Sequence, residues 1–258
     1  MKKVYIILSL IVFLFTSCEK VIDLDLNEAN PQLVVEGMVL TKANASYVHL
    51  NLTTSFYTPN TFENVDDAAV VIRTGNETYT MQNVGEGMYT NSSLIGESGK
   101  TYFLEIQYKG KTILAESTIP NFVKIDSLYY QTISMGPRGA SKRLFCKFTD
   151  PKKIENYYRF RVFINDTLNP EFNYTDDSFF DGNQYNMRLS SVKTGDTVLV
   201  QFLGIDKANY TFFKTIDSNT KRMNSSAPAN PVYNIEGENA IGFFEAATID
   251  EKTLVVKR

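Results

Sequence analysis

The chain is poor in the residue types from which most catalytic sites are built. Its 258 residues include one histidine, His49, two cysteines, Cys18 and Cys146, and no tryptophan. His49 lies on the polar phase of the alternating segment Tyr47–Thr53, so we expect it on the surface of a half-buried strand. A single histidine leaves no H-E-x-x-H motif and no histidine-rich zinc site. We therefore predict a protein that is not an enzyme, with hydrolysis by a pair of carboxylates as the remaining catalytic alternative.

Basic clusters and long apolar runs are also missing from most of the chain. Lysine and arginine together number 26 against 29 acidic residues, which gives a formal net charge of −3. A mildly acidic chain without basic runs argues against nucleic acid as a partner. The one extended apolar run, residues 4–15, is shorter than the roughly 20 residues that a membrane-spanning helix needs.

That apolar run has the features of an export signal. Lys2 and Lys3 precede it, as in the charged first region of a signal peptide. The sequence Phe15-Thr16-Ser17-Cys18 that ends it resembles a bacterial lipoprotein box, in which the cysteine is lipidated and becomes the new N-terminus. We therefore predict that residues 1–17 are a lipoprotein signal peptide. Cys18 is the predicted lipid attachment site, through which the protein is anchored to a membrane.

Lipidation of Cys18 leaves the second cysteine, Cys146, without a partner. We therefore expect no disulfide bond, and we expect Cys146 to behave as a small buried hydrophobic residue in the strand Leu144–Phe148. Residues 18–31 are acidic and end in Pro31, so we interpret them as a tether, in which Val21–Leu26 is a candidate edge strand.

The remaining sequence predicts an all-β fold made of two β-sandwich modules. Turn residues recur every 8–12 residues, and Gly75 and Gly110 each lie in a short turn between two strand patterns. Residues 32–120 have the length of an immunoglobulin-like or transthyretin-like sandwich, and residues 121–258 form the second module. The predicted strands are Leu33–Leu40, Tyr47–Thr53, Ala69–Thr74, Thr78–Gln82, Tyr102–Tyr108, Thr112–Ser117, Ile125–Tyr130, Arg143–Thr149, Tyr157–Ile164, Tyr185–Leu189, Thr197–Leu203, Gly242–Ala247 and Thr253–Val256.

One segment of the second module has the period of a helix instead. Asp206 is a residue type that caps helix N-termini, and Tyr210, Phe213 and Ile216 recur every three residues on one face. We predict one short helix near residues 206–217, packed on the sheet.

An acidic loop in the second module is the candidate ligand or partner loop. Asp176, Asp177 and Asp181 lie close together around Gly182, and carboxylate oxygens are the ligands that Ca²⁺ prefers. The spacing does not match an EF-hand, and acidic residues also occur in loops simply because water solvates them. Phe179 and Phe180 in the same loop are expected to be exposed, where they either pack between the modules or contact a partner.

Several short motifs together give a resemblance to a known family. In chain order they are Cys18, Val21–Leu24, Leu33–Gly37, Thr118–Pro120, Asp126–Ser127, Phe148–Pro151, Asn156–Arg159, Asp176–Asp177, Phe180–Gly182, Asn230–Pro231, Asn234–Gly237 and Gly242–Phe244. This order resembles the Bacteroidetes outer-membrane lipoproteins of the domain of unknown function DUF4249, over essentially the whole chain after residue 17.

The resemblance implies a location and a partner but no catalytic residue and no substrate. It implies a lipoprotein of the outer membrane that accompanies a TonB-dependent receptor in nutrient binding or uptake. We expect it at the cell surface rather than at the periplasmic face. The alternative is a stand-alone glycan-binding or adhesive module, in which tyrosine replaces the missing tryptophan as the aromatic surface.

Overall fold

The computed structural model describes residues 31–54, 62–134, 140–221 and 231–257. The predicted signal peptide, Cys18, most of the predicted acidic tether and the candidate strand Val21–Leu26 therefore lie outside the described residues. The chain from Pro31 onward forms one compact unit. Within the ranges given above, no helix combines the length and the apolar character needed to cross a membrane.

The described chain consists of strands and one helix, which confirms the all-β prediction. Alternation of β-branched or aromatic residues with polar ones gives most strands one buried and one exposed face. In the first half the strands are β1 (Leu33–Leu40), β2 (Tyr47–Leu52), β3 (Glu63–Asn64), β4 (Ala69–Thr74), β5 (Glu77–Gly85), β6 (Met88–Thr90), β7 (Thr101–Tyr108) and β8 (Lys111–Thr118). In the second half they are β9 (Ile125–Ser134), β10 (Ala140–Thr149), β11 (Tyr157–Ile164), β12 (Thr167–Leu168), β13 (Asn173–Asp176), β14 (Gln184–Val192), β15 (Thr197–Ile205), β16 (Ile235–Glu236) and β17 (Ala240–Val255), with helix α2 (Lys207–Lys221) between β15 and β16.

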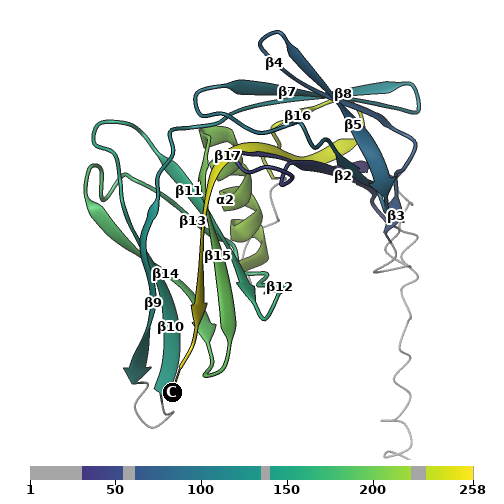
Figure 1. Ribbon diagram of the computed structural model, residues 1–258. Helices are drawn as coiled ribbons and strands as arrows, with labels where there is room; N and C mark the ends of the chain where they lie inside the picture. Colours follow the sequence, from purple (N-terminus) through teal and green to yellow (C-terminus); the bar gives the residue numbers. More distant parts are fainter. Residues whose placement is uncertain (1–30, 55–61, 135–139, 222–230, 258) are drawn as a thin grey trace, which may run out of the picture. The chain divides into compact units, whose positions relative to one another are not determined.

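The strands form two sheets. The larger follows the order β12-β11-β15-β17-β1-β2-β6-β5-β4-β7-β8-β16, and β13 and β3 pair with β11 and β2 beside this path. The smaller sheet has the order β14-β10-β9. It faces the β11, β15 and β17 part of the larger sheet across a shared core (Figure 1).

Strand β17 connects the two halves of the chain and corrects a prediction. From Ala240 to Ala247 it pairs in parallel with β1, and from Thr248 to Val255 it pairs antiparallel with β15. The sequence predicted two separate strands here, Gly242–Ala247 and Thr253–Val256, with a largely polar segment between them. That segment is held in the strand by tertiary partners, since Asp250 accepts a hydrogen bond from the backbone nitrogen of Ile125 at 2.7 Å. The proposed division of the chain at residue 120 stays a prediction, and β17 belongs to both halves.

Three buried clusters stabilise this arrangement. The first lies inside the first half, between β1, β2, β6 and the start of β17 on one side and β4, β7 and β8 on the other. The second fills the space between the two sheets. The third lies on the outer face of β11, β15, β17 and β1, where α2 covers it (Figure 1).

Helix α2 begins where the sequence predicted and extends four residues further. Asp206 caps it, because its Oδ1 accepts the backbone N–H of Asn209 at 2.9 Å. Tyr210 and Phe213 are buried against the sheet as expected, and Phe212 joins them. Burying these rings fixes the helix on the third cluster.

Candidate functional site

The structure separates the carboxylates of the acidic loop that the sequence singled out. Asp176 is the last residue of β13, and its Oδ2 accepts a hydrogen bond from the Tyr210 hydroxyl at 2.6 Å. Partial burial by itself raises the pKa of Asp176. Hydrogen bonds from Ser178 and Tyr210 outweigh this effect and hold the pKa below its usual value. This residue ties β13 to α2 and lies apart from the other acids of the loop.

Asp177 and Asp181 are brought together with Asp150, which the sequence analysis did not include in the candidate loop. Oxygens of the three carboxylates lie within 4.8 Å of one another. Each carboxylate accepts a backbone N–H: Asp150 from Gly182 at 2.9 Å, Asp177 from Asn156 at 2.8 Å and Asp181 from Lys153 at 2.6 Å. Burial, together with the charges of Asp150 and Asp181, raises the pKa of Asp177.

These hydrogen bonds indicate a structural role for the acidic cluster, because the three carboxylates fix the backbone of the loop. Ca²⁺ takes six to eight oxygen ligands, and the three carboxylates are already held in place by backbone groups. Calcium binding here stays a prediction.

The two aromatic residues of the loop have opposite environments. Phe179 is 96% exposed, as expected. Phe180 is 5% exposed, so the prediction that it is exposed is wrong. Its ring stacks on Tyr185 at a centroid distance of 4.1 Å and packs edge-on against Phe148 at 5.7 Å. The aromatic core between the sheets has room for one of the two neighbours, and the turn directs the other into solvent.

A groove of about 590 Å³ lies at the edge of the first half, where α2 begins. Its volume falls within the range of about 300–1,000 Å³ that is typical of ligand pockets. Its walls come from β7, β8, the start of α2 and the segment that contains β16. The lining residues are Phe103, Leu104, Leu114, Ala115, Glu116, Ser117, Thr118, Asp206, Lys207, Ala208, Tyr233, Asn234 and Glu236. Phe103 and Leu114 are 46% and 45% exposed, so the rim of the groove presents apolar surface.

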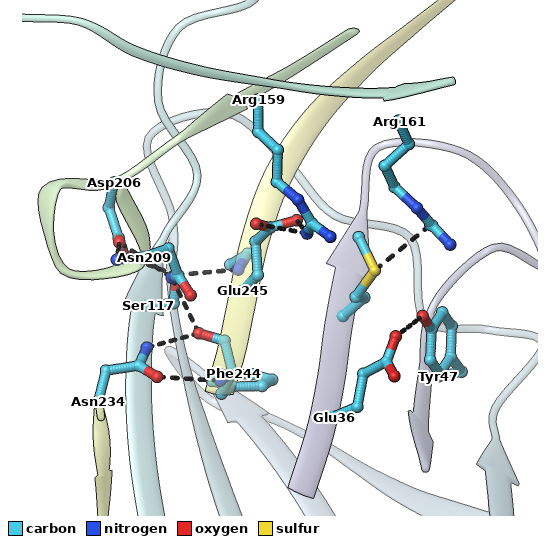
Figure 2. Close-up of polar contacts among 12 residues, drawn as sticks. Glu36, Tyr47, Ser117, Arg159, Arg161, Asp206, Asn209, Asn234, Phe244 and Glu245 are labelled. Carbon is cyan, nitrogen blue, oxygen red and sulfur yellow. Dashed lines mark hydrogen bonds and ion pairs between the residues drawn. The ribbon is translucent and has the colours of Figure 1, made fainter. Parts of the chain in front are cut away.

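Beneath this rim, hydrogen bonds connect three elements at Ser117. Its hydroxyl donates to Asp206 Oδ2 at 2.5 Å and accepts the backbone N–H of Ala246 in β17 at 2.9 Å. Asp206 Oδ2 also accepts the backbone N–H of Thr118 at 3.2 Å. Asn209 donates from Nδ2 to the Phe244 carbonyl at 2.9 Å (Figure 2). Because the cap of α2 is bonded to both β8 and β17, the groove has a rigid floor.

The same region of β17 is fixed from two further sides. Asn234 pairs with both backbone groups of Phe244: its Nδ2 donates to the carbonyl at 2.6 Å and its Oδ1 accepts the N–H at 3.0 Å. The next residue, Glu245, is fully buried and accepts hydrogen bonds from Arg159 Nη1 at 3.0 Å to each oxygen (Figure 2). Burial raises the pKa of Glu245, while the Arg159 charge opposes this shift. Sequence reasoning missed this pair, and the one signal for it was a charged residue inside the apolar run Gly242–Ala247.

His49 and Cys146 lie away from the groove. His49 contacts the Glu86 carbonyl through Nε2 at 3.1 Å. Cys146 is fully buried in β10 as predicted, and burial raises the pKa of its thiol to about 12. Neither residue lines the groove.

Comparison with protein families agrees with the predicted resemblance. The family model described as Domain of unknown function (DUF4249) matches residues 19–253. The chain belongs to this family. The DUF4249 match begins directly after Cys18 and contains the whole groove, the acidic loop and all of β17 except its last two residues. No curated protein matches this DUF4249 chain.

Proposed function

We propose that this protein is an accessory lipoprotein of the bacterial outer membrane that docks on a TonB-dependent receptor, and that it has no catalytic activity of its own. The groove beside β8 is the observation that carries this proposal. Its rim is apolar at Phe103 and Leu114, and its floor is fixed by hydrogen bonds among Ser117, Asp206 and Asn209. A pre-formed surface of this kind suits recognition, because little conformational freedom is lost on binding.

The remaining support for this location comes from the sequence. Residues 1–17 have the order of a signal peptide, and Cys18 follows a lipoprotein box. The family match starts at residue 19, as expected if the residues before it are a leader. An acylated cysteine supplies the two or more buried chains that stable anchoring requires.

A stand-alone glycan-binding module is the second candidate, and the composition of the groove favours it. Tyr233 and Phe103 provide aromatic surface, and the carboxylates of Glu116 and Glu236 provide hydrogen-bonding groups beside it. Aromatic surface with adjacent carboxylates is suited to sugar rings and their hydroxyls. The two candidates differ in what they retain from a membrane extract.

Affinity recovery from detergent-solubilised membranes of the native host tests the proposal. We expect the wild-type protein to recover a TonB-dependent receptor. Leu114→Asp is expected to lower the recovery at least tenfold, because it places a charge on the apolar rim. Val84→Asp is the matched control, since Val84 is 63% exposed on β5 and does not line the groove. Circular dichroism checks that both variants fold.

Each result has a defined meaning. Equal recovery by wild type and Leu114→Asp contradicts docking through the groove. Retention of glycans without a receptor, abolished by Leu114→Asp, supports the stand-alone module.

Cys18→Ala tests the anchor independently: we expect the variant to leave the membrane fraction during a carbonate wash, and a variant that stays with the membrane contradicts lipid anchoring. Proteolysis of intact cells reports which face of the membrane carries the protein.

A further inference from the structure

Strand β11 presents two arginines on one face. Phe160 and Val162 point into the core between the sheets, so Arg159 and Arg161 lie on the opposite face, which α2 partly covers. The two guanidinium groups are near neighbours in Figure 2 but have different surroundings.

Arg159 has a full set of partners. Its Nη1 lies 3.0 Å from both carboxylate oxygens of Glu245, and its guanidinium carbon lies 3.8 Å from the centre of the Phe213 ring. This arginine is therefore neutralised by a buried carboxylate and stacked on an aromatic ring.

Arg161 lacks a carboxylate partner. Its guanidinium carbon lies 5.5 Å from the centre of the Phe163 ring, and its Nη1 contacts the sulfur of Met38 at 3.5 Å. Its Nε is buried with no hydrogen-bond partner (Figure 2). Among the described residues, no carboxylate oxygen lies within 4.0 Å of it. Guanidinium is always charged in proteins, and a buried donor without an acceptor is unfavourable.

Two acids of the same sheet, Glu36 in β1 and Glu251 in β17, are engaged elsewhere. Glu36 accepts a hydrogen bond from the Tyr47 hydroxyl at 2.6 Å. Glu251 pairs with Lys42 at 2.5 Å and accepts Gln201 Nε2 at 2.8 Å. The charge of Arg161 acts on Glu245 and Tyr47 through space only, opposing the effect of burial on their pKa values. The N–H donors of Arg161 are therefore available to bind a ligand.

A cleft of about 280 Å³ opens on this arginine. Its walls are largely apolar or aromatic. Its lining includes Arg159, Arg161, Glu171, Phe172, Tyr174 and Phe213. The polar groups of this wall have partners of their own: Glu171 accepts the Ser190 hydroxyl at 2.9 Å, and Tyr174 donates to Asp217 at 2.8 Å.

We propose that this cleft binds a small monocarboxylate, with Arg161 as the residue that holds the carboxylate and the rings of Phe172, Tyr174 and Phe213 as the surface for its apolar part. A carboxylate matches the planar fork of guanidinium. The cleft is slightly smaller than pockets for drug-sized ligands, which suits a small molecule. The nearby carboxylates of Glu171 and Glu245 disfavour a dianion such as phosphate, because like charges repel. The site involves other residues than the receptor-docking groove and does not depend on it.

Titration calorimetry of the purified protein with phenylacetate tests the site. We expect phenylacetate to bind and its neutral amide, phenylacetamide, to bind at least tenfold more weakly. Arg161→Gln is expected to weaken phenylacetate binding at least tenfold. Arg161→Lys is expected to retain part of it, because it keeps the charge but loses the fork. Arg73→Gln is the control, since Arg73 is an exposed arginine paired with Glu105 at 2.5 Å.

A stability measurement separates a binding role from a structural one. If Arg161 lacks a carboxylate partner in the free protein, Arg161→Met leaves the urea midpoint of the free protein unchanged or raises it. A clearly lowered midpoint overturns the proposal, because it shows that Arg161 already has stabilising partners. Equal binding of the acid and the amide, equal binding by wild type and Arg161→Gln, or no binding of phenylacetate at millimolar concentration also overturns it. Receptor recovery by Arg161→Gln is expected to match wild type, so failure here is distinguishable from failure of the docking proposal.

Discussion

Two adjacent phenylalanines show how strongly the effect of a residue depends on its position in the structure. Phe180 is buried among Phe148, Tyr158 and Tyr185, whereas Phe179 extends into solvent. We predict that Phe180→Ala lowers the free energy of unfolding by about 3–5 kcal/mol, because it leaves a cavity in the aromatic core. Phe179→Ala is its matched control and is expected to change stability by no more than about 0.5 kcal/mol.

Urea unfolding followed by circular dichroism measures both variants. Similar losses for the two variants contradict the burial of Phe180 alone. Phe179 is also the one residue of this pair that a partner can reach, so any loss of binding in Phe179→Ala assigns the loop a role beyond its own folding.

Single residues were predictable where the local pattern alone decides their environment. Cys146 lies between Phe145 and Lys147 in a strand with alternating burial, and its burial follows from that pattern. The alternation of β11 similarly places Arg159 and Arg161 on one face. Their different partners were not predictable, because Glu245 is 86 residues from Arg159 in the sequence and reaches it through the pairing of β17.

At the scale of elements, β17 depends on a glycine at its point of closest approach to β1. Gly242 has φ +122°, and a Cβ at this position lies 1.9 Å from the Val35 carbonyl oxygen. We predict that Gly242→Ala lowers the free energy of unfolding by about 3 kcal/mol or more, because backbone strain and the clash with the backbone of β1 add together.

Gly75→Ala is the control for this prediction. Gly75 also has a positive φ, +54°, but no atom lies within 4 Å of its added Cβ. We expect a loss of about 1–2 kcal/mol for Gly75→Ala, the usual penalty of the left-handed conformation. Equal losses in urea unfolding indicate that β1 moves away from β17 without penalty, which contradicts a tight parallel pair.

Elements with a strong local signal were predicted, and those defined by distant partners were not. The cap at Asp206 and the three-residue recurrence of Tyr210, Phe213 and Ile216 identified α2 correctly. The continuous β17 was missed, because the residues in its middle are largely polar. Their strand conformation depends on tertiary contacts, such as the hydrogen bond from the backbone N–H of Ile125 to Asp250. The acidic cluster was only partly predicted, since Asp150 reaches Asp177 and Asp181 through tertiary folding.

At the scale of the whole molecule, tyrosines and carboxylates recur as buried or partly buried hydrogen-bonded pairs. Tyr158 donates to Asp150 at 2.5 Å, Tyr210 to Asp176 at 2.6 Å and Tyr47 to Glu36 at 2.6 Å. Tyr174 donates to Asp217 at 2.8 Å. Burial raises the pKa of all four phenols, and the hydrogen-bonded carboxylates raise it further, to about 12 for Tyr174. A chain without disulfide bonds among its described residues thus relies on neutral phenols to bridge its elements.

The high content of aromatic residues was visible in the sequence, which has 15 tyrosines and 18 phenylalanines. The pairing of tyrosines with carboxylates was not, because each pair joins different elements of the fold. The parallel contact of β1 with β17 is a similar case, since it unites segments about 200 residues apart.

These pairs predict a loss of stability at alkaline pH. A phenol ionises near pH 10 in the unfolded chain, whereas in the folded protein it stays protonated to higher pH. The folded state therefore binds more protons than the unfolded state above pH 10, and the free energy of unfolding falls as pH rises, by about 1.4 kcal/mol per pH unit for each retained proton. The contribution is fully present below pH 10. It is lost as pH rises through the folded pKa values.

Urea unfolding at several pH values between 8 and 11, with phenolate absorbance recorded for the folded protein, measures this dependence. We expect a nearly constant free energy of unfolding up to about pH 9 and a steep decline above pH 10, with the last part of the phenolate absorbance gained only as the protein unfolds. Tyr158→Phe is expected to be less stable than wild type at pH 8, because the buried Asp150 carboxylate loses the Tyr158 hydroxyl and keeps the Gly182 N–H as a donor, and to decline less steeply above pH 10. A free energy that stays constant up to pH 11, or phenolate absorbance that reaches its full value while the protein is still folded, contradicts the buried pairs.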